Sequence, residues 1–77
     1  MPELEVSFLR EDELEALRLC DLEGLDQVGA GERMGVSRGT VQRLLKAGRE
    51  TVVRALVRGE ALVIGEAGED QQGKEES

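Results

Sequence analysis

Side chains that can bond to nucleic-acid bases recur at helical spacing in the middle of the chain, and they are Arg38, Gln42, Arg43 and Lys46. Arginine can bond both O6 and N7 of guanine, and glutamine can bond both N6 and N7 of adenine. Gly39 removes a side chain where a groove wall or a phosphate would come close, unless it is simply a glycine that weakens a helix. These residue types at this spacing favour contact with the major groove of duplex DNA.

Residues that could carry out catalysis or hold a metal are missing from the sequence. It contains no histidine and a single cysteine, Cys20, so neither an internal disulfide nor a zinc site can form. No glycine-rich loop is followed by Lys-Ser or Lys-Thr, the pattern that cradles phosphates. Four carboxylates lie at the start of a predicted helix, where negative charge suits the helix dipole; they are Glu11, Asp12, Glu13 and Glu15. We therefore expect no enzyme activity, no cofactor and no metal, and we expect Cys20 to be a small buried apolar side chain.

The charge of the chain is strongly segregated, although its net value is −7. Residues 1–32 carry two basic and ten acidic side chains, a net charge of −8, and residues 59–77 carry one basic and six acidic, a net charge of −5. Residues 33–58 carry seven basic side chains against Glu50, a net charge of +6. DNA would meet this basic block rather than the average charge of the molecule. By itself, the block fits a solvated helix equally well.

The sequence predicts a mainly α domain over residues 1–65, and its three helices span residues 11–23, 26–34 and 37–58. Asp26 and Ser37 are the N-caps from which the second and third helices start. Gly35 can adopt the left-handed conformation that ends a helix, so a three-residue turn joins these two helices. Such a pair crosses steeply, as in the helix-turn-helix unit, although an αα-hairpin that merely folds has the same pattern. The crossing needs a small residue, Gly31, where we expect an added methyl group still to fit.

The third helix has two faces of different composition. Its apolar face is expected to join the core and consists of Val41, Leu44, Leu45, Gly48, Val52, Ala55 and Leu56. The opposite face carries the base-contacting side chains, and one arginine farther along the helix would contact phosphates. The predicted DNA-binding surface consists of Ser37, Arg38, Gly39, Gln42, Arg43, Lys46 and Arg49.

Two short strands are predicted to flank the helices, over residues 4–9 and 61–64. A two-stranded ribbon is marginal alone in water. Either the strands fold back over Val53 and Val57, a second apolar patch on the third helix, or a symmetric dimer covers this patch and the strand edge. The predicted dimer interface consists of Val53, Val57, Leu62 and Ile64. Residues 66–77, rich in Gly, Glu, Asp and Gln, are predicted to form a disordered acidic tail.

Several runs of residues, in this order, resemble a prokaryotic family of proteins of unknown function; they are Asp12 to Leu19, Asp21 to Leu25, Arg33 to Arg38, and Gln42 with Arg43. The resemblance covers residues 8–64, including the closing run from Gly59 to Ile64. Members of this family are regarded as small DNA-binding proteins similar to region 4 of sigma-70-type sigma factors. The resemblance implies a helix-turn-helix fold and DNA binding, but it supplies no defined function.

Two functions are compatible with these features. The turn and the basic block favour a sequence-specific DNA-binding protein that acts as a transcriptional regulator. The acidic flanks and the glycines of the second helix, Gly29 and Gly31, favour a protein-interaction module that binds RNA polymerase or another regulator. The sequence has no run of about 18 apolar residues that could span a membrane and no signal-peptide pattern. We therefore expect a cytoplasmic protein whose partners are duplex DNA and a second copy of itself.

Overall fold

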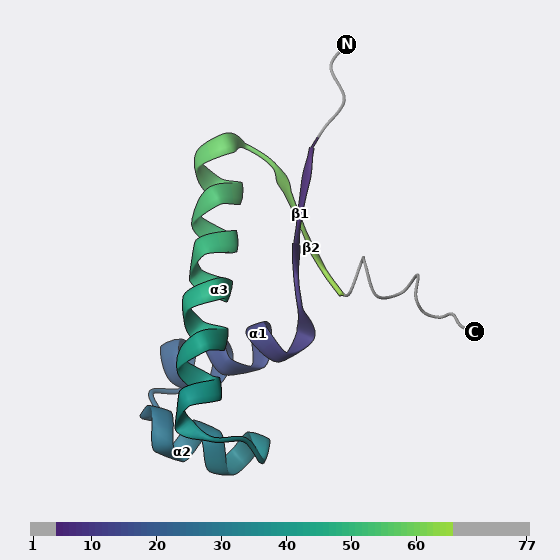
Figure 1. Ribbon diagram of the computed structural model, residues 1–77. Helices are drawn as coiled ribbons and strands as arrows, with labels where there is room; N and C mark the ends of the chain where they lie inside the picture. Colours follow the sequence, from purple (N-terminus) through teal and green to yellow (C-terminus); the bar gives the residue numbers. More distant parts are fainter. Residues whose placement is uncertain (1–4, 66–77) are drawn as a thin grey trace, which may run out of the picture.

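The structure of the protein, a computed structural model, describes residues 5–65. Its elements along the chain are β1 (Val6–Leu9), α1 (Glu11–Leu17), the π-helical segment η1 (Arg18–Leu22), α2 (Gln27–Met34), α3 (Arg38–Arg58) and β2 (Ala61–Ile64). Figure 1 shows α3 as the long axis of the molecule, with the other helices around one end and the strands beside the other. The predicted mainly α fold with two short strands is confirmed. Leu4 and the predicted acidic tail, residues 66–77, lie outside the described residues.

Capping side chains and left-handed glycines set the ends of the last two helices. Asp26 and Ser37 are the N-caps of α2 and α3, and each accepts a hydrogen bond from the backbone N–H three residues further on, at 2.7 and 3.1 Å. Gly35 and Gly59 follow these helices with φ angles of 75° and 68°, a region that residues with side chains rarely adopt. Both helices therefore begin directly after the caps that the sequence predicts.

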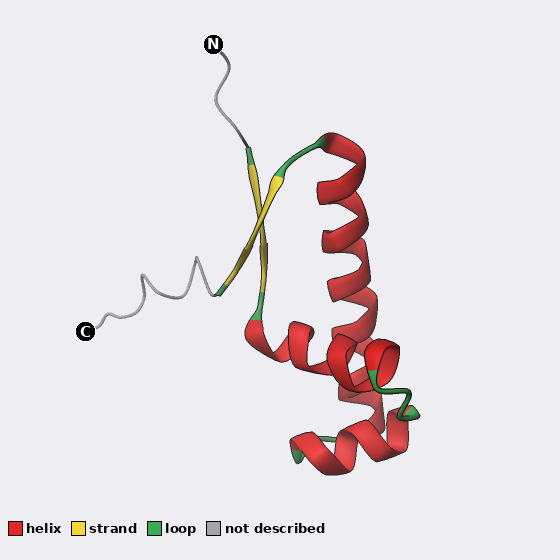
Figure 2. Ribbon diagram, turned by 180° about the vertical axis from the view of Figure 1, so that it is seen from behind, coloured by secondary structure: helices red, strands yellow, loops and turns green. Residues whose placement is uncertain are grey.

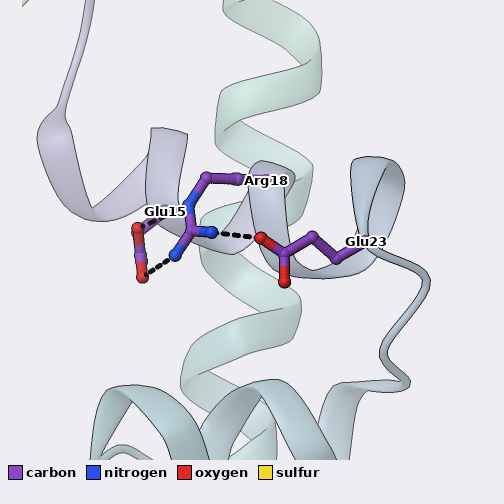
Figure 3. A network of polar contacts seen from close by, with 3 residues as sticks. All are labelled: Glu15, Arg18 and Glu23. Atoms are coloured by element: carbon purple, nitrogen blue, oxygen red, sulfur yellow. Dashed lines mark hydrogen bonds and ion pairs between the residues drawn. The ribbon is translucent and has the colours of Figure 1, made fainter.

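The first helix differs from the regular helix predicted over residues 11–23. It is α-helical only to Leu17 and continues as η1, where the backbone N–H of Glu23 donates to the carbonyl of Arg18 at 2.9 Å. The guanidinium of Arg18 donates to Glu15 at 2.7 and 3.2 Å and also to Glu23 (Figure 3). These bonds hold the wider π turn. They also compensate the positive charge of Arg18, one of two cations in the acidic N-terminal segment.

The hydrophobic core lies where α1, η1 and α2 pack around the N-terminal half of α3 (Figure 2). Its buried side chains are aliphatic, and they are Ala16, Leu19, Ala30, Val41 and Leu45. Gly48 allows α1 to approach α3 closely, because a Cβ at this position would lie 3.1 Å from Cδ1 of Leu17. Cys20 packs against the margin of the core but is only partly buried, so it is less enclosed than predicted.

β1 and β2 form a parallel two-stranded ribbon beside the C-terminal half of α3. The register aligns Ser7 with Leu62 and Leu9 with Ile64. Ser7 and Leu9 are 5% and 1% exposed, and we assign their face of the ribbon to the contact with α3. The Ser7 hydroxyl donates to the carboxylate of Glu60, which holds the start of β2 beside β1. The ribbon thus joins the two ends of the described chain.

The C-terminal half of α3 is covered on one side only. Thr51 and Ala55 are buried, whereas Leu56, which the apolar pattern assigns to the core, is 76% exposed. Val53 and Val57 each stand two residues from Ala55, and hence about 160° around the helix from it. They are 55% and 78% exposed. The alternative in which the strands fold back over Val53 and Val57 is therefore wrong.

Candidate nucleic-acid interface

A turn of three residues, Gly35 to Ser37, joins α2 to α3 and sets the angle between them. Ala30 of α2 and Val41 of α3 are fully buried in the core that these two helices share. Gly31 brings α2 against the turn, because a Cβ at Gly31 would lie 2.7 Å from the backbone carbonyl oxygen of Val36. The expectation that an added methyl group fits at Gly31 is therefore wrong. Backbone contact at this point fixes how α3 projects from the core.

The first turns of α3 present an exposed polar face whose members are Arg38, Gly39, Gln42, Arg43 and Lys46. Sequence reasoning missed Thr40, which connects two parts of this face. The Ser37 hydroxyl donates to Oγ1 of Thr40 at 3.0 Å, and Nη2 of Arg43 donates to the same oxygen at 3.2 Å. Because Ser37 is also the N-cap, these hydrogen bonds tie the guanidinium of Arg43 to the start of the helix.

Two cations of the predicted surface are paired with carboxylates that sequence reasoning did not assign to the site. Nζ of Lys46 lies 2.7 Å from Glu50, and Arg49 donates two hydrogen bonds to Asp21 of η1, at 2.6 and 3.1 Å. Hydrogen bonds from Arg49 hold the pKa of Asp21 below its ordinary value, and hydrogen bonding to Lys46 lowers the pKa of Glu50. Spacing of four residues could have indicated the pair within α3. No local pattern links Asp21 to Arg49, which are 28 positions apart.

Arg38 and Arg43 keep their positive charges uncompensated by a salt bridge within residues 5–65. The first turn of α3 contains no acidic residue, so the positive end of the helix dipole adds to these two guanidinium groups. A Cβ at Gly39 would meet nothing nearer than 3.9 Å, so the packing of the fold does not require glycine there. The face can therefore attract an anionic partner that also offers hydrogen-bond acceptors.

The four residues predicted for a dimer interface do not form one continuous patch. Val53 and Val57 lie in a shallow groove along α3 whose other lining residues are Arg49, Glu50, Arg54 and Arg58. Leu62 and Ile64 share the ribbon face of Ser7 and Leu9 and are 40% and 46% exposed. Since the two valines point away from Ala55 and the ribbon, only they belong to the groove.

These observations define a small, mainly helical protein with an exposed basic face at the start of its last helix. The sequence profile of the family described as "Protein of unknown function DUF134" matches residues 2–72. The chain belongs to this family, as its motifs indicate. The family description itself carries no likeness to sigma factors, and no solved structure matches the chain. Among residues 5–65, no helix combines the length and the apolarity needed to cross a lipid bilayer.

Similar proteins occur in several prokaryotes. The chain is 56% identical over 57 residues to UPF0251 protein TK0562 of Thermococcus kodakarensis, covering 74% of this chain and 50% of that protein. It is 57% identical over 53 residues to UPF0251 protein PF0620 of Pyrococcus furiosus, covering 69% and 49%. It is 49% identical over 61 residues to UPF0251 protein VPA0321 of Vibrio parahaemolyticus, covering 79% and 64%. The chain thus spans about half the length of the first two relatives, and none of the three names states an activity.

Proposed function

We propose that the protein binds duplex DNA through the first three turns of α3 and acts as a transcriptional regulator in the cytoplasm. The observation that carries the proposal is the uncompensated, exposed pair Arg38 and Arg43 beside Gln42 on a capped helix start. We propose a binding protein rather than an enzyme, because the chain contains no histidine and no cysteine pair from which a familiar catalytic constellation could be built.

The proposed contacts divide into base readout and phosphate binding. Gln42 and Arg43 would meet base edges in the major groove. The amide of Gln42 can donate to N7 of adenine and accept from its N6 amino group, and the guanidinium of Arg43, bonded to Thr40, can donate to both O6 and N7 of guanine. Arg38, in the first turn, would bind a phosphate or a base. Lys46 and Arg49 would bind phosphates only by exchanging their carboxylate partners for the DNA backbone.

A salt titration of binding to mixed-sequence duplex DNA tests the proposal. Binding through several phosphates makes the logarithm of the association constant fall linearly with the logarithm of the salt concentration, with a slope of about −0.9 per neutralised phosphate. We expect Arg43→Ala to cost about 1–3 kcal/mol on the preferred duplex and to relax its sequence preference. Arg54→Ala serves as the matched control, because Arg54 is an exposed arginine farther along the same helix.

A second candidate function is that of a protein-interaction module that binds RNA polymerase or another regulator. The observations that favour it are the carboxylates already bonded to Lys46 and Arg49, which reduce the charge available to DNA, and the apolar side chains exposed on the ribbon. The test compares the unchanged protein with an Arg38→Ala/Arg43→Ala variant at low salt. Equal affinity of the two for mixed duplex DNA contradicts the DNA proposal and favours this second function.

A further inference from the structure

The side chain of Thr40 connects the N-cap of α3 to the cation that the proposed function assigns to a base edge. Ser37, Thr40 and Arg43 are spaced three apart, so their side chains follow one face of the helix. The Thr40 hydroxyl oxygen accepts a hydrogen bond from the Ser37 hydroxyl at 3.0 Å and another from Nη2 of Arg43 at 3.2 Å. The Ser37 oxygen in turn accepts the backbone N–H of Thr40 at 3.1 Å. The guanidinium is thereby linked to the helix backbone.

Arg43 differs from the other cations of this face in the kind of group that holds it. Lys46 and Arg49 are bonded to carboxylates, which must be displaced before either cation can bind DNA. Arg43 is bonded to a neutral hydroxyl, which leaves its positive charge uncompensated. Within residues 5–65, the side chains of Arg38 and Gln42 take part in no hydrogen bond. Arg43 therefore combines an available charge with a fixed position.

The bond to Thr40 leaves free the atoms that would read a base. A guanidinium carries five N–H donors in one plane, and the bond from Nη2 uses a single one of them. A bidentate contact with O6 and N7 of guanine uses two more, so both contacts can be made at once. A Cβ at Gly39 would lie 4.0 Å from Nη1 of Arg43. The absence of a side chain at Gly39 thus keeps the space beside the guanidinium open.

A guanidinium that is already held binds a base at a lower cost. A free arginine loses rotamer freedom when it contacts a base, and this loss opposes binding. A side chain that is fixed beforehand loses less, so more of its contact energy contributes to affinity. A fixed fork of donors also discriminates between bases, because guanine offers two acceptors where adenine offers one acceptor and an amino group.

From this geometry we infer that Thr40 is a specificity-determining residue, which holds the guanidinium of Arg43 for the recognition of guanine. The inference rests on the proposed DNA function and adds a residue to it. Thr40 is a positioning residue, since it acts through Arg43 and not on a base itself.

A double-mutant cycle tests the inference, with binding measured to a duplex selected from random sequence and to mixed duplex DNA. Thr40→Val keeps the branched side chain and the backbone N–H that Ser37 caps, but it removes the hydroxyl oxygen. We expect it to reduce the preference for the selected duplex about fivefold. In an Arg43→Ala background the same substitution should change nothing further. Thr40→Ser, which retains the hydroxyl, should keep the preference.

The mobility of the Arg43 side chain in the absence of DNA gives a second measurement. NMR relaxation at Nε should show Arg43 to be more restricted than Arg54, an exposed arginine whose side chain takes part in no hydrogen bond within residues 5–65. Thr40→Val should make the two arginines equally mobile, and Thr40→Ser should not. A mere loss of stability would not change one arginine alone, and thermal unfolding verifies that both variants remain folded. Equal mobility in the unchanged chain overturns the inference.

The outcomes on DNA distinguish this inference from the proposed function. A chain that binds no duplex at low salt contradicts the proposed function, and the recognition of guanine with it, whatever the mobility of Arg43. A chain that binds DNA with the same preference after Thr40→Val overturns the inference alone. So does a loss of preference that persists in the Arg43→Ala background, because Thr40 would then contact DNA directly.

Discussion

Three glycines of the helices differ in which atoms an added side chain would meet. Gly31 is confined by a backbone oxygen, Gly48 by the Leu17 side chain, and Gly39 by nothing within 3.9 Å. The backbone oxygen near Gly31 cannot move without its neighbours, whereas the leucine near Gly48 can change rotamer. A side chain at Gly39 would have room without any adjustment. The sequence assigns Gly31 to the helix crossing, Gly39 to the predicted DNA-binding surface and Gly48 to the apolar face of the third helix. How closely each glycine is approached could not be predicted, because this distance depends on the tertiary fold.

Replacement of Gly39 by alanine separates folding from binding. We expect Gly39→Ala to raise the free energy of unfolding by up to about 1 kcal/mol, because alanine is the better helix former and its methyl group has room. The same methyl group should weaken duplex binding if a groove wall comes close at this position. Chemical denaturation and DNA titration measure the two effects. Unchanged affinity would show that the DNA does not approach Gly39.

Gly31→Ala should have the opposite effect on folding. A Cβ placed 2.7 Å from the Val36 carbonyl forces α2 away from the turn, and overpacking of this kind costs typically about 1–3 kcal/mol. We expect a lower melting temperature than that of the unchanged chain. Gly39→Ala provides the control for helix propensity alone. An equal rise in melting temperature in both variants would mean that the crossing relaxes at no cost.

Release of Arg49 should strengthen DNA binding. Asp21→Asn removes the carboxylate that accepts two hydrogen bonds from Arg49, so the guanidinium becomes free to bind a phosphate. We expect tighter binding to all duplexes and a salt slope steeper by about 0.9. Arg49 keeps the pKa of Asp21 below 3.8, so the native pair persists at neutral pH. The small contribution of this ion pair to the stability of the fold is present above pH 3.8 and is lost as the pH falls through the lowered pKa of Asp21. A salt slope unchanged by the substitution contradicts a phosphate role for Arg49.

At the level of elements, α2, α3 and the turn were the most predictable parts of the chain. Their limits follow from side chains that act locally: Asp26 and Ser37 as caps, and Gly35 as the left-handed end. The π turn of η1 was not predictable, because no side-chain cap marks the point at Arg18 where the helix widens, although Arg18 is bonded there to Glu15 and Glu23. Burial along the second half of α3 also depends on where the ribbon lies, so periodicity wrongly assigned Leu56 to the core.

Ser37 unites the cap of α3 with the proposed DNA face, and two substitutions distinguish these roles. Ser37→Ala removes the acceptor for the Thr40 N–H and should cost about 1 kcal/mol of stability. Ser37→Asp keeps a capping acceptor, so stability should be preserved, but its negative charge should weaken DNA binding. Thermal unfolding and a duplex titration measure the pair. Equal DNA affinity for Ser37→Asp and the unchanged chain would move the interface away from this turn.

At the scale of the whole molecule, the charge segregation read from the sequence becomes a spatial division. The described part of the acidic N-terminal segment, residues 5–32, forms β1, α1, η1 and most of α2, and its Arg18 is bonded to two glutamates (Figure 3). The basic block forms α3, which crosses this acidic unit and extends beyond it (Figure 1). Composition predicts that the N-terminal segment is acidic and that the block after it is basic, and periodicity predicts which residues share a helix face. The pairing of Arg49 with Asp21 needs the tertiary fold, which brings η1 beside α3.

The parallel register of the ribbon has a mechanical consequence. The backbone N–H of Ala61 donates to the carbonyl of Glu5, and that of Gly65 donates to the carbonyl of Leu9, both at 2.9 Å. The chain therefore enters the ribbon at one end and leaves it at the other. Tension applied between handles at Glu5 and Gly65 therefore slides the strands past each other in shear, and all the bonds between them bear the load together. The helical unit lies entirely between the two strands in sequence. A stretched chain would thus keep its helices unloaded until this short clamp slips.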